Sequence, residues 1–338
     1  MQIQSNFSLR NFNTFGLEST ASFFAEVSSV EELTEILLDP VWQQKPKFIL
    51  GGGSNVLFTQ NVNALVIHPV IKGIEKIKED EDHVWLKAGA GEGWHEFVMH
   101  CVSHNFGGVE NLSLIPGTVG AAPMQNIGAY GVEIKDVVES VEAVSIESGM
   151  KRIFSKEECE FGYRESVFKK ALKNQYVVTG VTFVLDKKPV LNIGYGDVQK
   201  TLLEMNVTSP TIQDVSQAVI AIRRSKLPDP AQIGNAGSFF KNPEIPSEQY
   251  NSLKNIFPEM PGYVISETMV KVPAGWLIEQ AGWKGYRQGA IGVHHKQALV
   301  LVNYGGGNGN EIRALAGTIQ DSVEAKYGIR LSPEVNFI

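Results

Sequence analysis

The pattern of hydrophobic positions predicts short strands in the first half of the chain and longer helices in the second. Four apolar runs bounded by glycine, proline or polar residues are typical of strands: 47–50, 56–58, 64–67 and 84–88. From Trp94 to Val102 apolar residues recur at helical spacing, which predicts an amphipathic helix with one buried stripe. A further strand is predicted over 176–185, with Val177, Val181, Phe183 and Leu185 on one face.

The polar segment 186–189 marks the boundary that we predict between two domains. Beyond it, Thr211 and Asp214 have the spacing of a capping box, and an apolar stripe from Val215 to Ile222 follows on the same predicted helix. The end of the chain predicts a strand, a glycine turn, a helix and a last strand, at 297–302, 305–307, 312–323 and from 329 onward. This order predicts an α+β second unit with a β-α-β crossover.

Composition narrows the class of protein. The 338 residues correspond to about two domains, and 43% hydrophobic with 20% charged residues is typical of a globular protein. A net charge of −7 argues against a nucleic-acid-binding protein, and no apolar run is long enough to predict a membrane span. The N-terminus has no signal-peptide pattern, and the two cysteines and seven histidines show no metal-ligand spacing. We therefore expect a cytoplasmic protein with reduced thiols and no metal.

Glycine is over-represented, at 33 of 338 residues, or about 10% against a usual 7%. The loop Gly51-Gly52-Gly53-Ser54-Asn55 is either a tight turn or a cradle for a phosphate, because bare N–H groups can converge on an anion. The loop 89–93 leaves the same two interpretations open. Neither loop matches the dinucleotide fingerprint G-x-G-x-x-G, which disfavours a Rossmann site.

The uncharged segment 115–131 has no period of 2 or 3.6. Such a stretch is either buried in a core or wrapped around a large flat ligand. Arg164, beside Tyr163, can bind a carboxylate or phosphate, or it can be a surface arginine that pairs with Glu165. Ser238 lacks the Gly-x-Ser-x-Gly elbow of acyl transfer, so proton donation or hydrogen bonding is the expected role. Glu334 lies in the predicted last strand, where a carboxylate usually faces solvent.

Taken together, eight motifs in order resemble the UDP-N-acetylenolpyruvoylglucosamine reductase (UDP-N-acetylmuramate dehydrogenase) family: GGGSNVLF, IPGTVGAAPMQNIGAYGVE, FGYRES, RRSKLPDP, GNAGSFFKNP, AGWLIEQ, HHKQALVLVN and PEVNFI. The segment 250–271 is similar to the longer form of this family, which carries a tyrosine loop. The resemblance implies an FAD-binding domain of the vanillyl-alcohol-oxidase type over 17–188, with two α+β subdomains. It implies a C-terminal α+β substrate-binding domain over 189–338.

The resemblance implies non-covalent FAD, with NADPH as co-substrate. Residues 51–55 would hold the pyrophosphate and 116–131 would line the isoalloxazine. The implied cofactor-binding residues are Gly51, Gly52, Gly53, Ser54, Asn55, Pro116, Gly117, Gln125, Asn126, Gly128, Gly131 and Arg223. The UDP-sugar would contact Tyr195, Lys226, Asn242, Tyr263 and Gln297. No other partner is implied, and we expect a monomer.

The implied reaction is the reduction of UDP-N-acetylglucosamine enolpyruvate to UDP-N-acetylmuramate, a step of bacterial peptidoglycan precursor synthesis. Hydride adds to the methylene carbon, so negative charge develops on the adjacent carbon and its carboxylate and requires preorganised donors. The resemblance assigns Arg164 and Glu334 to this charge, Glu334 as a protonated donor with a raised pKa, and Ser238 to proton donation.

Two other functions stay open at this point. A flavin oxidase would tend to tether FAD to a histidine or cysteine, and the two glycine loops contain neither. A non-catalytic flavin- or nucleotide-sugar-binding protein would have no need for Arg164, Ser238 and Glu334 together.

Overall fold

The computed structural model describes residues 2–338 and groups them into two compact units. Unit 1 contains the segments up to Phe7, Thr20–Gly53 and Val62–Ser225; unit 2 contains Ser8–Ser19, Ser54–Asn61 and Lys226–Ile338. Each unit combines helices and sheets, which confirms the α+β prediction. Contacts group residues 189–225 with unit 1, and the functional division at residue 188 stays a prediction.

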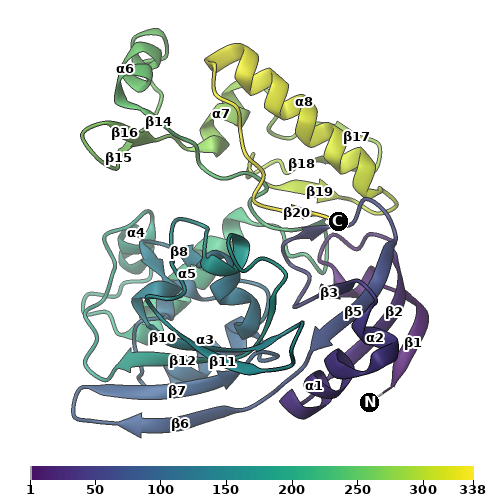
Figure 1. Cartoon of the computed structure of the whole chain (residues 1–338). Helices are drawn as coiled ribbons and strands as arrows, with labels where there is room; N and C mark the ends of the chain where they lie inside the picture. Colours follow the sequence, from purple (N-terminus) through teal and green to yellow (C-terminus); the bar gives the residue numbers. More distant parts are fainter. Residues whose placement is uncertain (1) are drawn as a thin grey trace. The chain divides into compact units, whose positions relative to one another are not determined.

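The first sheet of unit 1 has the order β1-β2-β5-β3, and β5 is parallel to both β2 and β3. Its strands are β1 (Ile3–Ser8), β2 (Thr20–Val27), β5 (Val62–Pro69) and β3 (Lys47–Ile49). The short helices α1 (Val30–Leu38) and α2 (Pro40–Gln43) connect β2 to β3 beside this sheet (Figure 1). α1 begins where the Ser29 hydroxyl accepts a hydrogen bond from the Glu32 N–H, a normal N-cap.

The second sheet of unit 1 is antiparallel, with the order β11-β10-β12-β7-β6. Its strands are β6 (Ile74–Glu79), β7 (His83–Gly89), β10 (Val138–Ser145), β11 (Lys151–Ser155) and β12 (Tyr176–Asp186). The helix α3 (Trp94–Ser103) packs on it with its whole predicted stripe buried, which confirms that prediction. β12 lies between β10 and β7, and it is buried along nearly its whole length, so residues on both of its faces are covered.

Short elements and two helices complete unit 1. They are η2 (Glu110–Leu112), η3 (Val119–Gln125), β8 (Gly128–Ala129), β9 (Val132–Glu133), η4 (Ile134–Asp136), η5 (Val167–Lys169), α4 (Val198–Glu204) and α5 (Ile212–Lys226). The capping box predicted for α5 is present, because the Thr211 N–H donates to the Asp214 carboxylate (2.8 Å) and the Asp214 N–H donates to Thr211 Oγ1 (3.3 Å).

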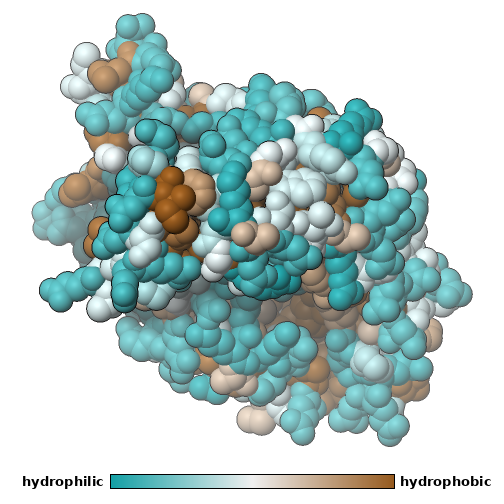
Figure 2. All heavy atoms as spheres, turned by 90° about the horizontal axis from the view of Figure 1, so that it is seen from above, coloured by the Kyte–Doolittle hydropathy of each residue, from teal (hydrophilic) through white to brown (hydrophobic). Residues whose placement is uncertain are grey.

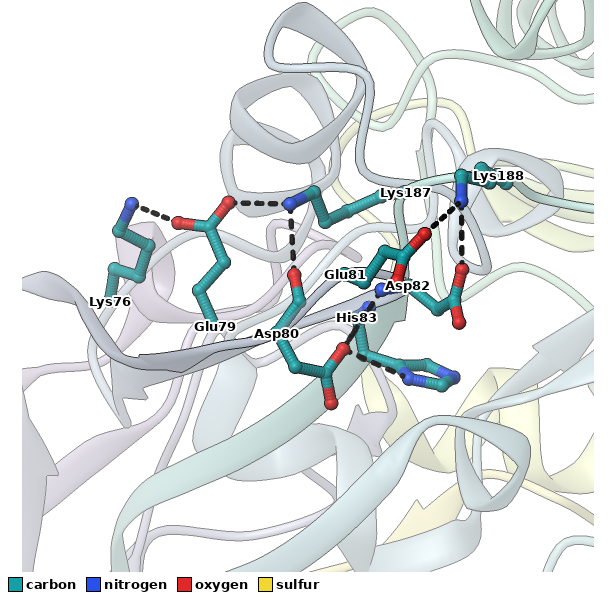
Figure 3. A network of polar contacts seen from close by, with 8 residues as sticks. All are labelled: Lys76, Glu79, Asp80, Glu81, Asp82, His83, Lys187 and Lys188. Carbon is teal, nitrogen blue, oxygen red and sulfur yellow. Dashed lines mark hydrogen bonds and ion pairs between the residues drawn. The ribbon is translucent and has the colours of Figure 1, made fainter.

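A network of charged side chains joins the β6–β7 turn to the end of β12 (Figure 3). Lys187 Nζ lies 2.8 Å from a Glu79 carboxylate oxygen, and the Lys187 N–H donates to the Asp82 carbonyl at 2.8 Å. The hydrogen bonds and charges of Lys187 and Lys76 lower the pKa of Glu79 to about 2. The network fixes the point at which the chain leaves the second sheet, although exposed ion pairs of this kind add little stability.

Unit 2 is built on the sheet β13-β19-β18-β17, formed by β13 (Gly234–Asn235), β19 (Leu301–Asn303), β18 (Ile291–Val293) and β17 (Arg287–Gln288). The helix α8 (Gly309–Tyr327) lies along β18 and β19 (Figure 1) with its predicted apolar stripe buried. Its ends are set by an Asn308–Glu311 capping box and by Gly328 at φ +64°. Unit 2 also contains η1 (Arg10–Phe12) and α7 (Ala274–Gln280).

Two predictions for the end of the chain are wrong. The strand expected over 297–302 begins only at Leu301, because Val300 donates to the Gln297 carbonyl (3.1 Å) in a turn between β18 and β19. The last strand, β20 (Asn336–Phe337), pairs with β4 (Val56–Leu57) in a separate sheet, so β19, α8 and β20 form no β-α-β crossover. An apolar run indicates burial, but it does not identify the strand with which a segment pairs.

The segment 250–271, predicted as the tyrosine loop, belongs to a slightly longer piece of unit 2, 244–271, which forms a small sheet with the order β14-β16-β15 and the helix α6 beside it. Its elements are β14 (Glu244–Pro246), α6 (Ser247–Ile256), β15 (Tyr263–Val264) and β16 (Met269–Lys271). The residues on either side of this piece are hydrogen-bonded to each other, since the Val272 N–H donates to the Pro243 carbonyl at 2.9 Å.

The surface is mainly polar on the face that Figure 2 shows, where apolar residues form small separate patches. None of the helices over residues 2–338 is long and apolar enough to span a membrane.

Candidate functional site

The two segments expected to hold FAD, 51–53 and 116–118, are in contact within unit 1. A Cβ atom added to Gly52 would lie 2.9 Å from the Gly117 Cα, and one added to Gly51 would lie 3.0 Å from Thr118 Oγ1. Gly53 and Gly117 have φ values of +61° and +116°, which side chains disfavour. The glycines are therefore needed for this close approach of two backbones. Pro116 is exposed at its edge, and Gln125 is half-buried further along.

The second glycine loop, 89–93, is a structural turn. A Cβ atom on Gly89 would lie 2.4 Å from the Ile71 carbonyl oxygen, and one on Gly91 would lie 2.4 Å from the Val70 carbonyl carbon. The backbone of residues 70–71 therefore fills the space that these glycines leave. This contact favours the tight-turn interpretation over a phosphate cradle.

Left-handed backbone at residues other than glycine gathers in the candidate site. Leu114, Tyr130 and Arg164 have φ values of +58°, +49° and +55°, and Asn126 has +45°. In the part of the chain that the structure describes, Glu160 is the only further such residue that is not asparagine. This conformation is strained for residues with large side chains, and such strain concentrates at functional sites.

Arg164 lies on a tight turn in which Gly162 and Glu165 exchange backbone hydrogen bonds of 3.0 and 3.2 Å. Its guanidinium donates to the Gly128 carbonyl at 2.7 Å, while Glu165 forms an ion pair with Lys170 at 2.6 Å. These contacts orient the Arg164 guanidinium toward the predicted flavin segment.

Asn126 holds this turn in place. Its amide donates to the Gly162 carbonyl (3.0 Å) and to the Glu133 carboxylate (2.9 Å), and its oxygen accepts from the Lys135 N–H (3.1 Å). The side chain is fully buried, so its polar atoms are engaged with protein. We expect Asn126 to shape the site rather than to contact the cofactor through its side chain.

Arg223 on α5 is a partly buried cation whose guanidinium Nε donates to the Leu114 carbonyl at 3.2 Å. Burial lowers the pKa of this guanidinium, and the electrostatic interaction with Tyr130 opposes that shift. Among residues 2–338 no carboxylate forms an ion pair with Arg223. A desolvated cation without a counter-charge fits an anionic ligand, as the phosphates of FAD would be.

Two asparagines that the sequence reasoning missed connect this region to Tyr195. Asn111, 1% exposed, donates to the carbonyls of Tyr130 (3.0 Å) and Asn192 (2.8 Å), and the Asn192 amide donates to the Gly131 carbonyl (3.1 Å). A Cβ atom on Gly131 would lie 3.1 Å from the Tyr195 Cβ. The exposed Tyr195 side chain is thus carried on a segment tied to the segment predicted to line the flavin. The local sequence around Asn111, Val-Glu-Asn-Leu-Ser, gives no signal of this role.

In unit 2 the structure brings Ser238 and Glu334 together on adjacent segments. The Glu334 N–H donates to the Phe239 carbonyl at 2.8 Å, and Phe240 forms a β-bridge with Pro333. Ser238 is exposed, and Phe239 and Phe240 are buried and hold it at the surface. Glu334 is half-buried and precedes β20 instead of lying in it, which corrects the predicted position.

The second half of the glycine loop also belongs to unit 2. The side-chain amide of Asn55 donates to the Glu334 carbonyl (3.2 Å), and the backbone carbonyl of Asn55 accepts from the Asn336 N–H (3.1 Å). Ser54 precedes Asn55 and is half-buried. The loop predicted to hold a pyrophosphate therefore supports the backbone of Glu334.

Two of the predicted UDP-binding residues meet at the first turn of α7. Asn242 Oδ1 accepts from the Ala274 N–H at 2.9 Å, and a Cβ atom on Gly275 would lie 3.3 Å from Gln297 Oε1. Lys226, at the end of α5, and Tyr263, in β15, are exposed elsewhere in unit 2.

Known proteins resemble this chain over its whole length. A protein of Flavobacterium johnsoniae named UDP-N-acetylenolpyruvoylglucosamine reductase is 54% identical over 100% of both chains, and one of Amoebophilus asiaticus with the same name is 49% identical over 100% of both. The family model "UDP-N-acetylenolpyruvoylglucosamine reductase, C-terminal domain" matches residues 229–338, and "FAD binding domain" matches 21–153. The crystal structure of the reductase from Thermus caldophilus has the same fold (TM-score 0.69, 24% identity, 99% of this chain and 98% of that chain).

Proposed function

This chain belongs to the UDP-N-acetylenolpyruvoylglucosamine reductase family and is an FAD-binding oxidoreductase, and we propose that it uses NADPH to reduce UDP-N-acetylglucosamine enolpyruvate to UDP-N-acetylmuramate. The identity of 54% over the full length of a relative with that name carries the proposal. We further propose that the protein acts as a cytoplasmic monomer and supplies peptidoglycan precursors.

FAD, when bound, would transfer a hydride from NADPH to the enolpyruvyl group of the sugar nucleotide. We assign its binding to the segments 51–55 and 116–131 and to Arg223. Two features of unit 1 support this assignment: the fold brings the segments 51–53 and 116–118 together, and none of the described residues forms an ion pair with Arg223. The Asn126 side chain would act indirectly, by fixing the Gly162 turn.

The proposed roles of Arg164 and Glu334 follow from where charge develops. Hydride addition at the methylene carbon leaves negative charge on the adjacent carbon and on the carboxylate of the substrate. The Arg164 guanidinium, oriented by the Gly128 carbonyl, would stabilise that charge, and a protonated Glu334 would donate a hydrogen bond to it. Preorganisation makes such donors effective: the Gly128 carbonyl orients the Arg164 guanidinium, and the bond to the Phe239 carbonyl fixes the backbone of Glu334.

Ser238 would donate its hydroxyl proton to the carbon that receives the charge. A serine hydroxyl is a weak acid, so this step requires a strongly basic intermediate and a relay that restores the proton. The exposure of Ser238 and the backbone pairing of its neighbour Phe239 with Glu334 support this role, because they carry a donor and a charge-stabilising group on one frame.

We propose that Tyr195, Lys226, Asn242, Tyr263 and Gln297 bind the UDP-sugar. The location of Asn242 and Gln297 beside the first turn of α7 supports a joint contact. Lys226 would supply positive charge for the diphosphate, which a protein of net charge −7 must provide locally.

The decisive experiment follows the two half-reactions under anaerobic conditions. Purified yellow protein is mixed with NADPH, and bleaching of the flavin absorbance is recorded. The enolpyruvyl sugar nucleotide is then added, and we expect the absorbance to return with one equivalent of product. A flavin that NADPH does not reduce, or that this substrate does not reoxidise, would refute the proposal. Rapid reoxidation by oxygen without the substrate would instead support a flavin oxidase.

A further inference from the structure

The peptide at Leu114 is held from both sides immediately before the Ile115-Pro116-Gly117 segment. The Leu114 N–H donates to His95 Nδ1 at 3.0 Å, and the Leu114 carbonyl accepts from Arg223 Nε at 3.2 Å. Leu114 has φ +58°, a conformation that leucine rarely adopts without external support. Two hydrogen bonds from α3 and α5 therefore stabilise a strained residue next to the backbone that contacts Gly52.

We propose that His95 is a positioning residue for FAD: as a neutral imidazole it holds Leu114 and thereby the Pro116–Gly117 segment, and protonation of His95 releases that hold. The proposal rests on the proposed use of this segment for FAD. It follows from hydrogen-bond chemistry, because an imidazole nitrogen that accepts a proton cannot also accept the Leu114 N–H bond. With Nδ1 as the acceptor, the neutral ring carries its proton on Nε2.

The surroundings of His95 favour the neutral ring. Burial lowers the pKa of His95, and the nearby charges of Arg224 and Arg223 on α5 lower it further. Glu96, next to His95 on α3, opposes these effects and raises the pKa. At neutral pH the ring is therefore mainly neutral and holds Leu114, and the hold is lost as the pH falls through a pKa that lies below the ordinary histidine value of about 6.5.

The test compares His95→Asn and His95→Leu in the purified holoenzyme. An asparagine Oδ1 occupies nearly the place of the histidine Nδ1 and accepts a hydrogen bond at every pH, whereas leucine removes the acceptor. His100→Asn is the matched control, because His100 lies on the same helix with its ring against His104. Free FAD is measured after ultrafiltration of each protein at pH 8.0 and at pH 5.5, and the flavin spectrum is recorded alongside.

We expect His95→Leu to raise the FAD dissociation constant about tenfold at pH 8.0, the scale of one partly buried N–H that loses its acceptor. At pH 8.0, His95→Asn should bind FAD as tightly as the wild-type protein does. When the pH is lowered to 5.5, this variant should lose much less FAD affinity than the wild-type protein loses. The control should follow the wild type at both pH values. A wild-type dissociation constant in the leucine variant, or an equal loss at low pH in the asparagine variant, would overturn the proposal.

If the leucine variant fails to fold, the pH dependence of FAD binding in the asparagine variant still tests whether His95 positions Leu114. Failure of the proposed reaction would be recognised separately, because this test measures FAD binding and needs neither NADPH nor the sugar nucleotide. A protein that binds FAD with the expected His95 dependence but does not reduce the enolpyruvyl substrate would refute the reaction and support the positioning role.

Discussion

Replacing Ser238 with alanine separates a catalytic role from a structural one. Ser238 is exposed, and none of the described residues accepts a hydrogen bond from its hydroxyl. Its neighbours Phe239 and Phe240 are buried, and their backbone contacts with the segment of Glu334 do not use the serine side chain. We therefore expect Ser238→Ala to change the free energy of unfolding by less than about 0.5 kcal/mol.

The effect on the reaction should be much larger. Loss of a positioned proton donor costs roughly 10²- to 10⁴-fold in rate, or about 3–5 kcal/mol of transition-state stabilisation. Because the proton is needed only after hydride addition, reduction of the flavin by NADPH should keep its wild-type rate. Stopped-flow absorbance measures both half-reactions, and urea denaturation measures stability.

Ser332→Ala is the matched control for this experiment. Ser332 is also exposed, and its contact with this segment is a backbone bond from the Lys241 N–H to its carbonyl (2.9 Å), which alanine preserves. The control should leave both half-reactions unchanged. Equal slowing of both half-reactions in Ser238→Ala, or an unchanged second half-reaction, would show that Ser238 is not the proton donor.

Three further predictions concern stability and reactivity. Gly317 lies inside α8 with no atom within 4 Å of an added Cβ, so Gly317→Ala should stabilise the protein by about 1 kcal/mol in urea denaturation; destabilisation would refute this reading of the helix. Burial raises the pKa of Cys159 to about 12 and that of Cys101 well above its usual range, so a thiol reagent at pH 8 should modify neither cysteine in the native protein and both in urea. The lowered pKa of Glu79 means that its contribution to stability is present above pH 4.5 and is lost as the pH falls toward 2; the melting temperatures of wild type and Glu79→Gln should therefore converge over that range, and a constant difference would contradict the ion pair with Lys187.

Hydrophobic periodicity was sufficient to predict those helices and strands that bury one continuous stripe of their own residues. The stripe from Trp94 to Val102 predicts α3 because every residue of the stripe is buried against one sheet. The same reasoning failed for 297–302, where the apolar run is buried but a turn at Gln297 interrupts it. Hydrogen-bond partners are chosen by tertiary structure, which a single segment does not encode.

The motifs were sufficient to predict the family, whereas the packing of the candidate site could not be predicted from single segments. A glycine in the sequence does not reveal whether a ligand or another backbone lies opposite it, and in the structure Gly52 faces Gly117 while Gly91 faces Val70. Leucine gives no signal of a left-handed conformation, so Leu114 and its support by His95 were invisible in the sequence. The absence of an ion-pair partner for Arg223 in residues 2–338 likewise emerges only when distant segments are folded together.

The two ends of the tyrosine segment, 244–271, lie next to each other in unit 2, so the segment can be replaced without moving the rest of the unit. With Val272 bonded to Pro243, the chain on either side of 244–271 is already closed, so a short turn could connect it at little entropic cost. Asn242 caps the next helix, α7, from outside the segment and would stay in place. Gain or loss of this piece would therefore leave the backbone pairing of the Ser238 and Glu334 segments intact, so the segment can vary between relatives without rebuilding that pairing.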